Sequence, residues 1–211
     1  MKKVLLLAAM FIATLSANAQ NEVGQFTLQP KVGMNLAMLT DTKINGSDGS
    51  FKVDLVAGVE AEYGIAEKFS VAAGLLYSRQ GTSFGDFEAY VNSGTPVGYK
   101  GLKYNMDYLN IPIVANYYLA PGFAIKAGIQ PGFLMSAKEK ADGVNSADVD
   151  VDFKDACEKF DLSIPLGLSY QFSDFVIDAR YNLGLTKVNK DGDSSSKNGV
   201  IQITLGYKFA L

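Results

Sequence analysis

IQITLGYKFAL, residues 201–211, carries an apolar side chain at every second position. Gln202, Thr204, Gly206 and Lys208 occupy the positions between them. Side chains of a β-strand point alternately to its two faces, so the stretch predicts a strand with one apolar and one polar face. In an α-helix the same apolar residues would be spread around the whole axis.

Seven earlier stretches repeat this alternation, and the connections between them are alternately long and short. The predicted strands are Phe26–Leu39, Lys52–Ile65, Phe69–Gly81, Tyr104–Leu119, Phe123–Ser136, Phe160–Phe172, Phe175–Thr186 and Gly199–Leu211. The long connections are Thr40–Phe51, Thr82–Lys103, Ala137–Lys159 and Lys187–Asn198. If each strand pairs with the next, all long connections lie at one end, as in outer-membrane barrels with short periplasmic turns and long extracellular loops. The pattern predicts an all-β, eight-stranded, antiparallel up-and-down transmembrane β-barrel with both termini periplasmic.

Glycines decide which face of the predicted barrel meets lipid. They share the parity of the charged residues, at Gly33, Gly58, Gly74, Gly128, Gly132, Gly167, Gly184 and Gly206. The interior of an eight-stranded barrel is just wide enough for side chains to fill, so small residues beside long polar ones fit a crowded lumen. The alternative is a soluble, secreted, lipocalin-like ligand-binding barrel with its apolar face inside, but there the glycines would weaken the strands without a packing reason.

The N-terminal residues have the three parts of a secretory signal. Lys2 and Lys3 precede an apolar run from Val4 to Leu15, and Ala17-Asn18-Ala19 is an A-x-A cleavage site. The sequence therefore predicts a signal peptide at residues 1–19, cleaved after Ala19, and a barrel domain at residues 20–211 in the cell outer membrane.

Composition excludes several classes of function. The chain contains no histidine and one cysteine, Cys157, so it has neither a Ser-His pair nor an internal disulfide. Its net charge of −3 argues against nucleic acid as a partner. We expect no enzyme activity and no cofactor, because the usual general base of small outer-membrane enzymes is missing.

The charged residues at the polar positions of the predicted strands must all lie inside the lumen. They are Lys31, Asp54, Glu60, Glu62, Lys126, Asp161, Asp178, Arg180 and Lys208. An unpaired buried ion costs several kcal/mol, so these residues are interpreted as a structural salt-bridge network that plugs the lumen. A narrow path for small solutes or ions is the alternative.

Two of the long connections contain candidate contact residues. Aromatic side chains suited to adhesion are Phe84, Phe87, Tyr90, Tyr99 and Tyr104, although rings in such loops also pack on the barrel rim. Weak candidates for a cation site are Asp148, Asp150, Asp152 and Asp155. Phe153 and Lys159 stand where an EF-hand needs Gly and Glu, so the spacing is not that of a calcium loop, and no metal is expected.

Four segments resemble the PorT-type, porin-family-like outer-membrane barrels of Bacteroidota. They are Tyr-Leu-Asn-Ile-Pro-Ile at 108–113, the glycine-rich stretch 126–132, Asp-Ala-Arg-Tyr-Asn-Leu-Gly-Leu at 178–185, and 203–209. The resemblance covers the predicted mature chain and implies location and architecture only, since most members have no assigned activity. A location in the outer membrane makes its lipid and the barrel insertion machinery the expected partners. The expected function is a monomeric, structural or surface-interaction protein of the outer membrane, which binds an extracellular partner, if any, through the long loops.

Overall fold

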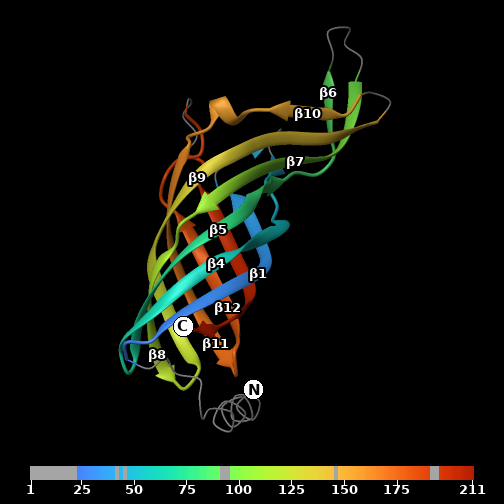
Figure 1. Ribbon diagram of the computed structural model, residues 1–211. Coiled ribbons are helices and arrows are strands. Elements are labelled where there is room, and N and C mark those ends of the chain that lie inside the picture. Colours follow the sequence, from blue (N-terminus) through green and yellow to red (C-terminus); the bar gives the residue numbers. More distant parts are fainter. Residues whose placement is uncertain (1–22, 41–42, 45–46, 91–95, 145–146, 191–194) are drawn as a thin grey trace, which may run out of the picture.

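The strands of the computed structural model close into a barrel, with several strands continuing past one end (Figure 1). The structure describes residues 23–40, 43–44, 47–90, 96–144, 147–190 and 195–211. The predicted signal peptide lies outside these residues. No helix within the described ranges is both long and apolar enough to cross a bilayer.

The barrel wall is built from ten of the fourteen strands that the described residues form. They are β1 (Phe26–Leu39), β4 (Lys52–Ala66), β5 (Phe69–Ser83), β7 (Pro96–Asn110), β8 (Ile113–Ala120), β9 (Phe123–Val144), β11 (Phe160–Phe172), β12 (Phe175–Gly184), β13 (Asn198–Tyr207) and β14 (Phe209–Ala210). The remaining elements lie in the long connections: β2 (Lys43–Ile44), β3 (Ser47–Asp48), β6 (Phe87–Tyr90), β10 (Val149–Asp152) and the 3-10 helix η1 (Lys154–Ala156).

Antiparallel pairing runs from strand to strand around the wall and returns to its start. β1 pairs with β4 on one side and with β13 and β14 on the other. β7 and β8 follow one another along a single wall position between β5 and β9, as β13 and β14 do beside β1. Counted in this way the wall has eight strands, and the predicted closed antiparallel barrel is confirmed.

Pro112 divides the predicted strand Tyr104–Leu119 into β7 and β8. A proline has no N–H to donate to a strand ladder. The wall stays closed across the gap, because the amide of Ile111 donates to the carbonyl of Pro131 at 2.8 Å and the carbonyl of Pro112 accepts from Gly74 at 2.9 Å. The proline interrupts the strand without opening the barrel.

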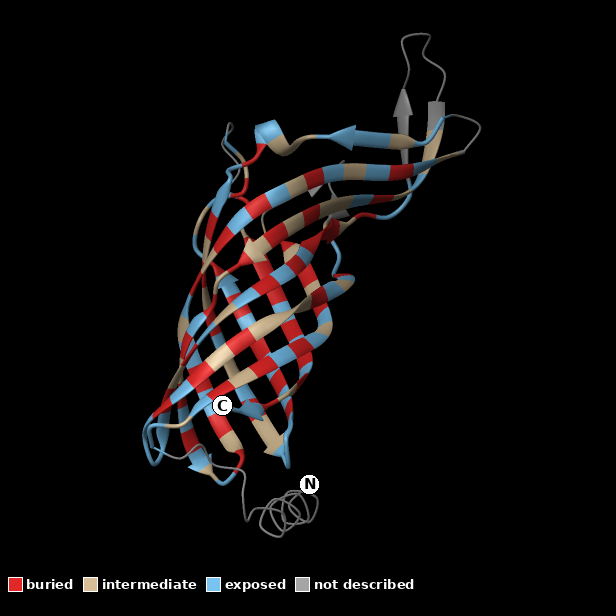
Figure 2. Cartoon of the chain, in the orientation of Figure 1, coloured by how far each residue is buried: buried red, intermediate tan, exposed pale blue. Residues whose placement is uncertain are grey.

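The two faces of the wall have opposite polarity, and the apolar one points outward. Exposed and buried residues alternate along the wall strands (Figure 2). Outward side chains such as Ile177 and Leu205 are 56% and 50% exposed, whereas Asn35, Asp178 and Gln202 on the other parity are fully buried. The alternative of a soluble lipocalin-like barrel is therefore wrong, because that barrel would carry its apolar side chains inside.

Two of the predicted long loops are largely strand, which corrects the sequence analysis. Thr82–Lys103 contains β6 and the first part of β7, and Ala137–Lys159 contains the last part of β9, β10 and η1. β7 and β9 remain paired as far as Gly98 and Val144, and β6 and β10 pair along their outer edges. The result is a four-stranded sheet, β6-β7-β9-β10, that continues beyond the barrel (Figure 1).

Bulges hid these strand extensions from the sequence pattern. The β7–β9 register shifts between Lys100 and Lys103, where Gly101 has a φ of +59°, and again between Asp107 and Tyr108. At the second shift Asp107 pairs with Ser136 and Tyr108 with Leu134, so Met135 is an extra residue on β9. One extra residue reverses the parity of everything that follows it, and a period-2 search then loses the strand.

We expect Gly128→Val to impair folding, because a Cβ at Gly128 would lie 2.0 Å from the carbonyl oxygen of Ile113 on the neighbouring strand. A backbone atom cannot move aside as a flexible side chain can. The neighbouring Ala127→Val is the matched control, since Ala127 is exposed on the apolar face. Heat-modifiable gel mobility measures the folded fraction, and equal folding of the two variants would contradict this prediction.

Candidate functional site

The centre of the lumen holds five buried charged side chains in mutual contact. Nη1 of Arg180 lies 2.9 Å from Oε1 of Glu60, and its Nη2 lies 2.7 Å from Oδ2 of Asp178. Nζ of Lys31 is 2.6 Å from Glu60, and Nζ of Lys126 is 2.6 Å from Asp178. These residues come from β1, β4, β9 and β12, so the cluster links opposite parts of the wall across the lumen.

A second cluster surrounds Glu62, toward the short-turn end of β4. Nζ of Lys208 is 2.9 Å from Oε2 of this carboxylate, while the hydroxyls of Ser70 and Tyr118 donate to its other oxygen. Asn116 in turn donates to Ser70 at 3.0 Å. The carboxylate is thus balanced by one cation and fixed by two hydroxyl donors.

Asp161 lies in a third polar group and has neutral partners. Thr186 and Asn198 donate to its Oδ1 at 3.1 and 3.2 Å, and Asn198 also reaches the hydroxyl of Tyr108 at 3.3 Å. Hydrogen bonds therefore hold this carboxylate, whereas ion pairs hold those of Glu60, Glu62 and Asp178.

Lys52 pairs with Asp54, and it is a lumen residue that the sequence analysis missed. Lys52 stands two residues before Asp54 on β4, so strand alternation alone would have placed its side chain on the same lumen face. With it, the charges described so far are five cations and five carboxylates. The cations are Lys31, Lys52, Lys126, Arg180 and Lys208; the carboxylates belong to Asp54, Glu60, Glu62, Asp161 and Asp178. The interior charges named here sum to zero.

An apolar cluster lies above the polar groups, at the long-loop end of the lumen. It contains Leu39, Met106, Tyr108, Leu134, Ala137, Cys157 and Val188. Cys157 follows η1 and Val188 follows β12, and their connections join where the amide of Glu158 donates to the carbonyl of Val188 at 2.7 Å. Burial raises the pKa of the Cys157 thiol to about 11, so the thiol is protonated and poorly nucleophilic at neutral pH.

Three of the five aromatic candidates pack against other side chains, and the side chains of the other two lie outside the described residues. Phe84 is buried with Leu102 and Ala141, and Tyr99 and Tyr104 pack against this group. The rings of Phe84 and Tyr104 meet edge to face with centroids 5.7 Å apart. The backbones of Phe87 and Tyr90 form β6, but their side chains lie outside the described residues. The rings that are described stabilise the base of the projecting sheet.

Three of the four aspartates proposed as weak cation ligands each bind a different partner. Asp148 accepts from the amide of Gly143, Asp150 pairs with Lys140 at 3.1 Å, and Asp152 accepts from the amide of Lys154. Within the described part of the chain, no three acidic, cysteine or histidine side chains come together as a metal site would need. The fourth candidate, Asp155, follows Lys154 in η1.

Comparison with known proteins identifies the family. Residues 18–190 match the model of the outer membrane protein β-barrel domain. The chain belongs to this family. This outer-membrane β-barrel protein matches no curated protein in sequence.

Several solved outer-membrane barrels are similar in structure to this family member. Ail, the attachment invasion locus protein of Yersinia pestis, solved with the heparin analogue sucrose octasulfate, is 16% identical; the match covers 89% of this chain and 100% of Ail, with a TM-score of 0.49. The Neisserial surface protein A is 13% identical, with 87% and 97% covered and a TM-score of 0.48. OprG from Pseudomonas aeruginosa is 13% identical, with 90% and 98% covered and a TM-score of 0.44.

We predict that Glu60→Gln destabilises the barrel by about 3–5 kcal/mol, since removing one partner of a buried ion pair leaves uncompensated charge. Three cations would then share the single carboxylate of Asp178. The double variant Lys31→Met/Glu60→Gln removes one of those cations and should recover part of the loss. Urea unfolding in detergent or vesicles measures the free energy of unfolding of the single and the double variant. If the two changes are simply additive, the charge-balance explanation is wrong.

Proposed function

We propose that this protein is a closed barrel of the outer membrane whose role is to present a rigid sheet outside the cell for contact with a partner. In this proposal the leader is cleaved after Ala19, the short turns are periplasmic and the long-loop end is extracellular. The PorT-type resemblance belongs to the same proposal and supplies architecture without an activity. The observation that carries it is the sheet β6-β7-β9-β10.

The length of β9 supports an extracellular role for this sheet. The strand has 22 residues, while about 9–11 residues suffice to cross a bilayer at a tilt. About half of β9 is therefore available beyond the apolar belt, together with its partner β7. Loops whose only task is to connect wall strands do not need this length.

The outer edges of the sheet are suited to binding an extended polypeptide. Among the described residues, β6 and β10 each pair on one side only, so their other edges present backbone donors and acceptors. A partner strand could extend the sheet at either edge by β-augmentation.

The interior supports a structural role for the barrel itself. Ion pairs cross the centre of the lumen, and the apolar cluster around Cys157 fills its long-loop end. We therefore propose that the lumen does not conduct. The sequence contains no histidine, and this absence supports a role without catalysis.

A narrow channel is the second candidate, and unpaired polar atoms favour it. Among the described residues, buried amide atoms of Gln29, Asn110, Gln130 and Gln202 have no protein hydrogen-bond partner. Buried polar groups of this kind normally bind water. A file of water along the wall would be the starting point for a path that small solutes could follow.

Conductance distinguishes the two candidates. We expect the full-length protein in planar bilayers to show no large, stable single-channel current, because the charged side chains meet across the lumen. A porin of about sixteen strands, whose lumen is an aqueous channel, is the positive control. A steady ohmic current from this protein would exclude the closed barrel and favour the channel.

Shortening the β6–β7 hairpin tests the surface role. Replacement of residues 86–100 by a short turn should abolish the binding of displaying cells to arrayed extracellular polypeptides, while heat-modifiable mobility stays normal. Replacement of residues 41–48 in the first long connection is the matched control. Identical binding profiles for the wild type and both variants would contradict the proposal.

A further inference from the structure

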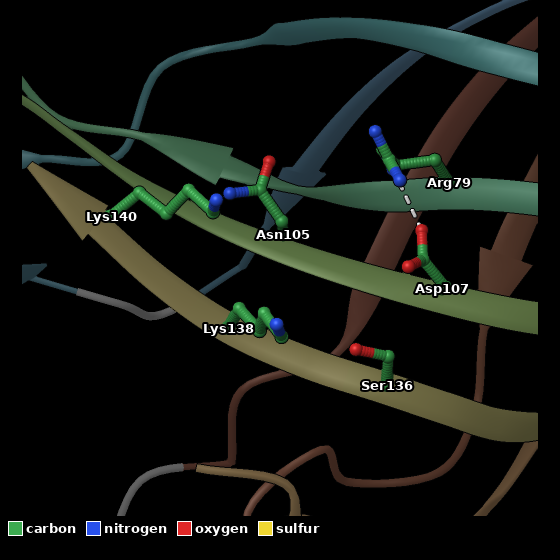
Figure 3. Close-up of a pocket in the computed structure, with 6 residues that line it drawn as sticks. All are labelled: Arg79, Asn105, Asp107, Ser136, Lys138 and Lys140. Carbon is green, nitrogen blue, oxygen red and sulfur yellow. Dashed lines mark hydrogen bonds and ion pairs between the residues drawn. The ribbon is translucent and has the colours of Figure 1, made fainter. Parts of the chain in front are cut away.

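A polar hollow lies on the outer wall of the barrel, away from the lumen. Its volume is about 380 Å³, and it is lined by Arg79 on β5, Asn105 and Asp107 on β7, and Ser136, Lys138 and Lys140 on β9 (Figure 3). Three neighbouring strands thus contribute to it. The extra residue at Met135 directs the lysines of β9 to the outer face.

Strand register places this hollow immediately above the apolar belt. Tyr77, Leu109 and Phe133 are cross-strand neighbours and form the last apolar row. The next row is Arg79, Asp107 and Ser136, the one after it Gly81, Asn105 and Lys138, and the third pairs Lys103 with Lys140.

These rows coincide with the depth of lipid headgroups. Rows two residues apart are about 7 Å apart along a strand. The headgroup region extends about 5–8 Å beyond the hydrocarbon core on each side. Because barrel strands are tilted by about 40°, the rows are about 5 Å apart along the membrane normal. The first polar row therefore lies at headgroup level, and the second lies just above it, within reach of a headgroup for a long lysine side chain. Gly81 contributes no side chain to the second of these rows.

The lining itself contains three basic residues and one acidic residue, and two aspartates of β10 lie beside its lysines. Arg79, Lys138 and Lys140 face one carboxylate, Asp107, which accepts from Nε of Arg79 at 2.7 Å. From the neighbouring strand β10, Asp150 pairs with Lys140 at 3.1 Å, and Asp152 is the register partner of Lys138.

Lys138 has the charge least committed to other groups. No carboxylate of the described residues forms an ion pair with Lys138, which is exposed beside Asn105 and Ser136. Glu139 lies on the opposite face of β9, where burial raises its pKa. The hollow thus offers an ammonium group, a guanidinium group and neutral hydrogen-bond donors to an incoming anion.

We propose that the hollow binds the phosphate of a phosphorylated membrane lipid whose acyl chains lie along the apolar row of Tyr77, Leu109 and Phe133. Lys138 and Lys140 would contact the phosphate, with Arg79 at its edge and Asn105 and Ser136 as hydrogen-bonding neighbours. That the lipid belongs to the outer leaflet rests on the orientation given under the proposed function. The polar hollow and the apolar row together match a molecule with an anionic head and acyl tails.

Lipid retention measures this binding directly. The full-length barrel is reconstituted in phosphatidylcholine vesicles containing bisphosphorylated lipid A, extracted in mild detergent, and analysed for co-purified lipid by native mass spectrometry. We expect Lys138→Gln/Lys140→Gln to lower lipid A retention about tenfold or more, since each basic residue near a membrane surface contributes appreciably to anionic lipid binding. Asp107→Asn should raise retention, because it releases Arg79 from its carboxylate.

The control is Lys68→Gln, which removes an exposed lysine at the short-turn end. We expect it to retain lipid A like the wild type. Equal retention by the wild type and the double variant, or equal retention of dephosphorylated lipid A, would overturn the proposal. If inorganic phosphate displaces lipid A, and also binds the lipid-free protein in detergent in a way that depends on the same two lysines, the hollow is a site for free anions. That result would also overturn the proposal.

Heat-modifiable mobility and vesicle flotation report insertion separately from lipid binding. A variant that folds and floats but loses lipid A supports the site. Protease accessibility of the β6–β7 hairpin in whole cells reports orientation, so a reversed barrel would contradict the proposed function while leaving the phosphate site intact.

Discussion

One geometric constraint governs this molecule: a side chain on an eight-stranded wall faces either lipid or a lumen that has room for side chains alone. Lipid accepts the apolar residues of one parity. The other parity must then satisfy itself within a narrow space, where an unpaired charge costs several kcal/mol. The balanced ion pairs around Arg180 and the glycines that stand where two strands approach closely are both consequences of that requirement.

The sequence was informative wherever alternation ran unbroken. The predicted bounds of Phe26–Leu39 and Phe160–Phe172 are those of β1 and β11. Alternation failed at the Pro112 interruption and at the bulges of β7 and β9, because a missing donor or an extra residue changes the pairing without changing the composition. The sheet beyond the barrel was therefore taken for loop.

In the lumen, strand alternation predicts which residues point inward, but only the register between strands determines which of them meet. Parity grouped nine charged residues on one face, but it could not tell that Arg180 would join Glu60 to Asp178, since those contacts depend on how four strands align. Hydroxyl donors such as Tyr118 were also hidden, because an aromatic ring on a strand gives no sign that its hydroxyl meets a buried carboxylate. The outer hollow was not predicted from the sequence, because its residues come from three strands and those of β9 lie beyond a bulge.

Met135 shows how much one residue can decide in a structure of this kind. If β9 kept strict alternation through Met135 instead of bulging there, the outer face above Phe133 would continue through positions 137, 139 and 141, and would present two alanines with Glu139 between them. Ser136, Lys138 and Lys140 would turn to the side that the apolar cluster now fills. The bulge at Met135 thus decides between a basic collar and a mostly apolar one with an acidic group, in which two lysines would compete for the mouth of the lumen. Surface chemistry in this fold depends on where a strand bulges as much as on which residues it contains.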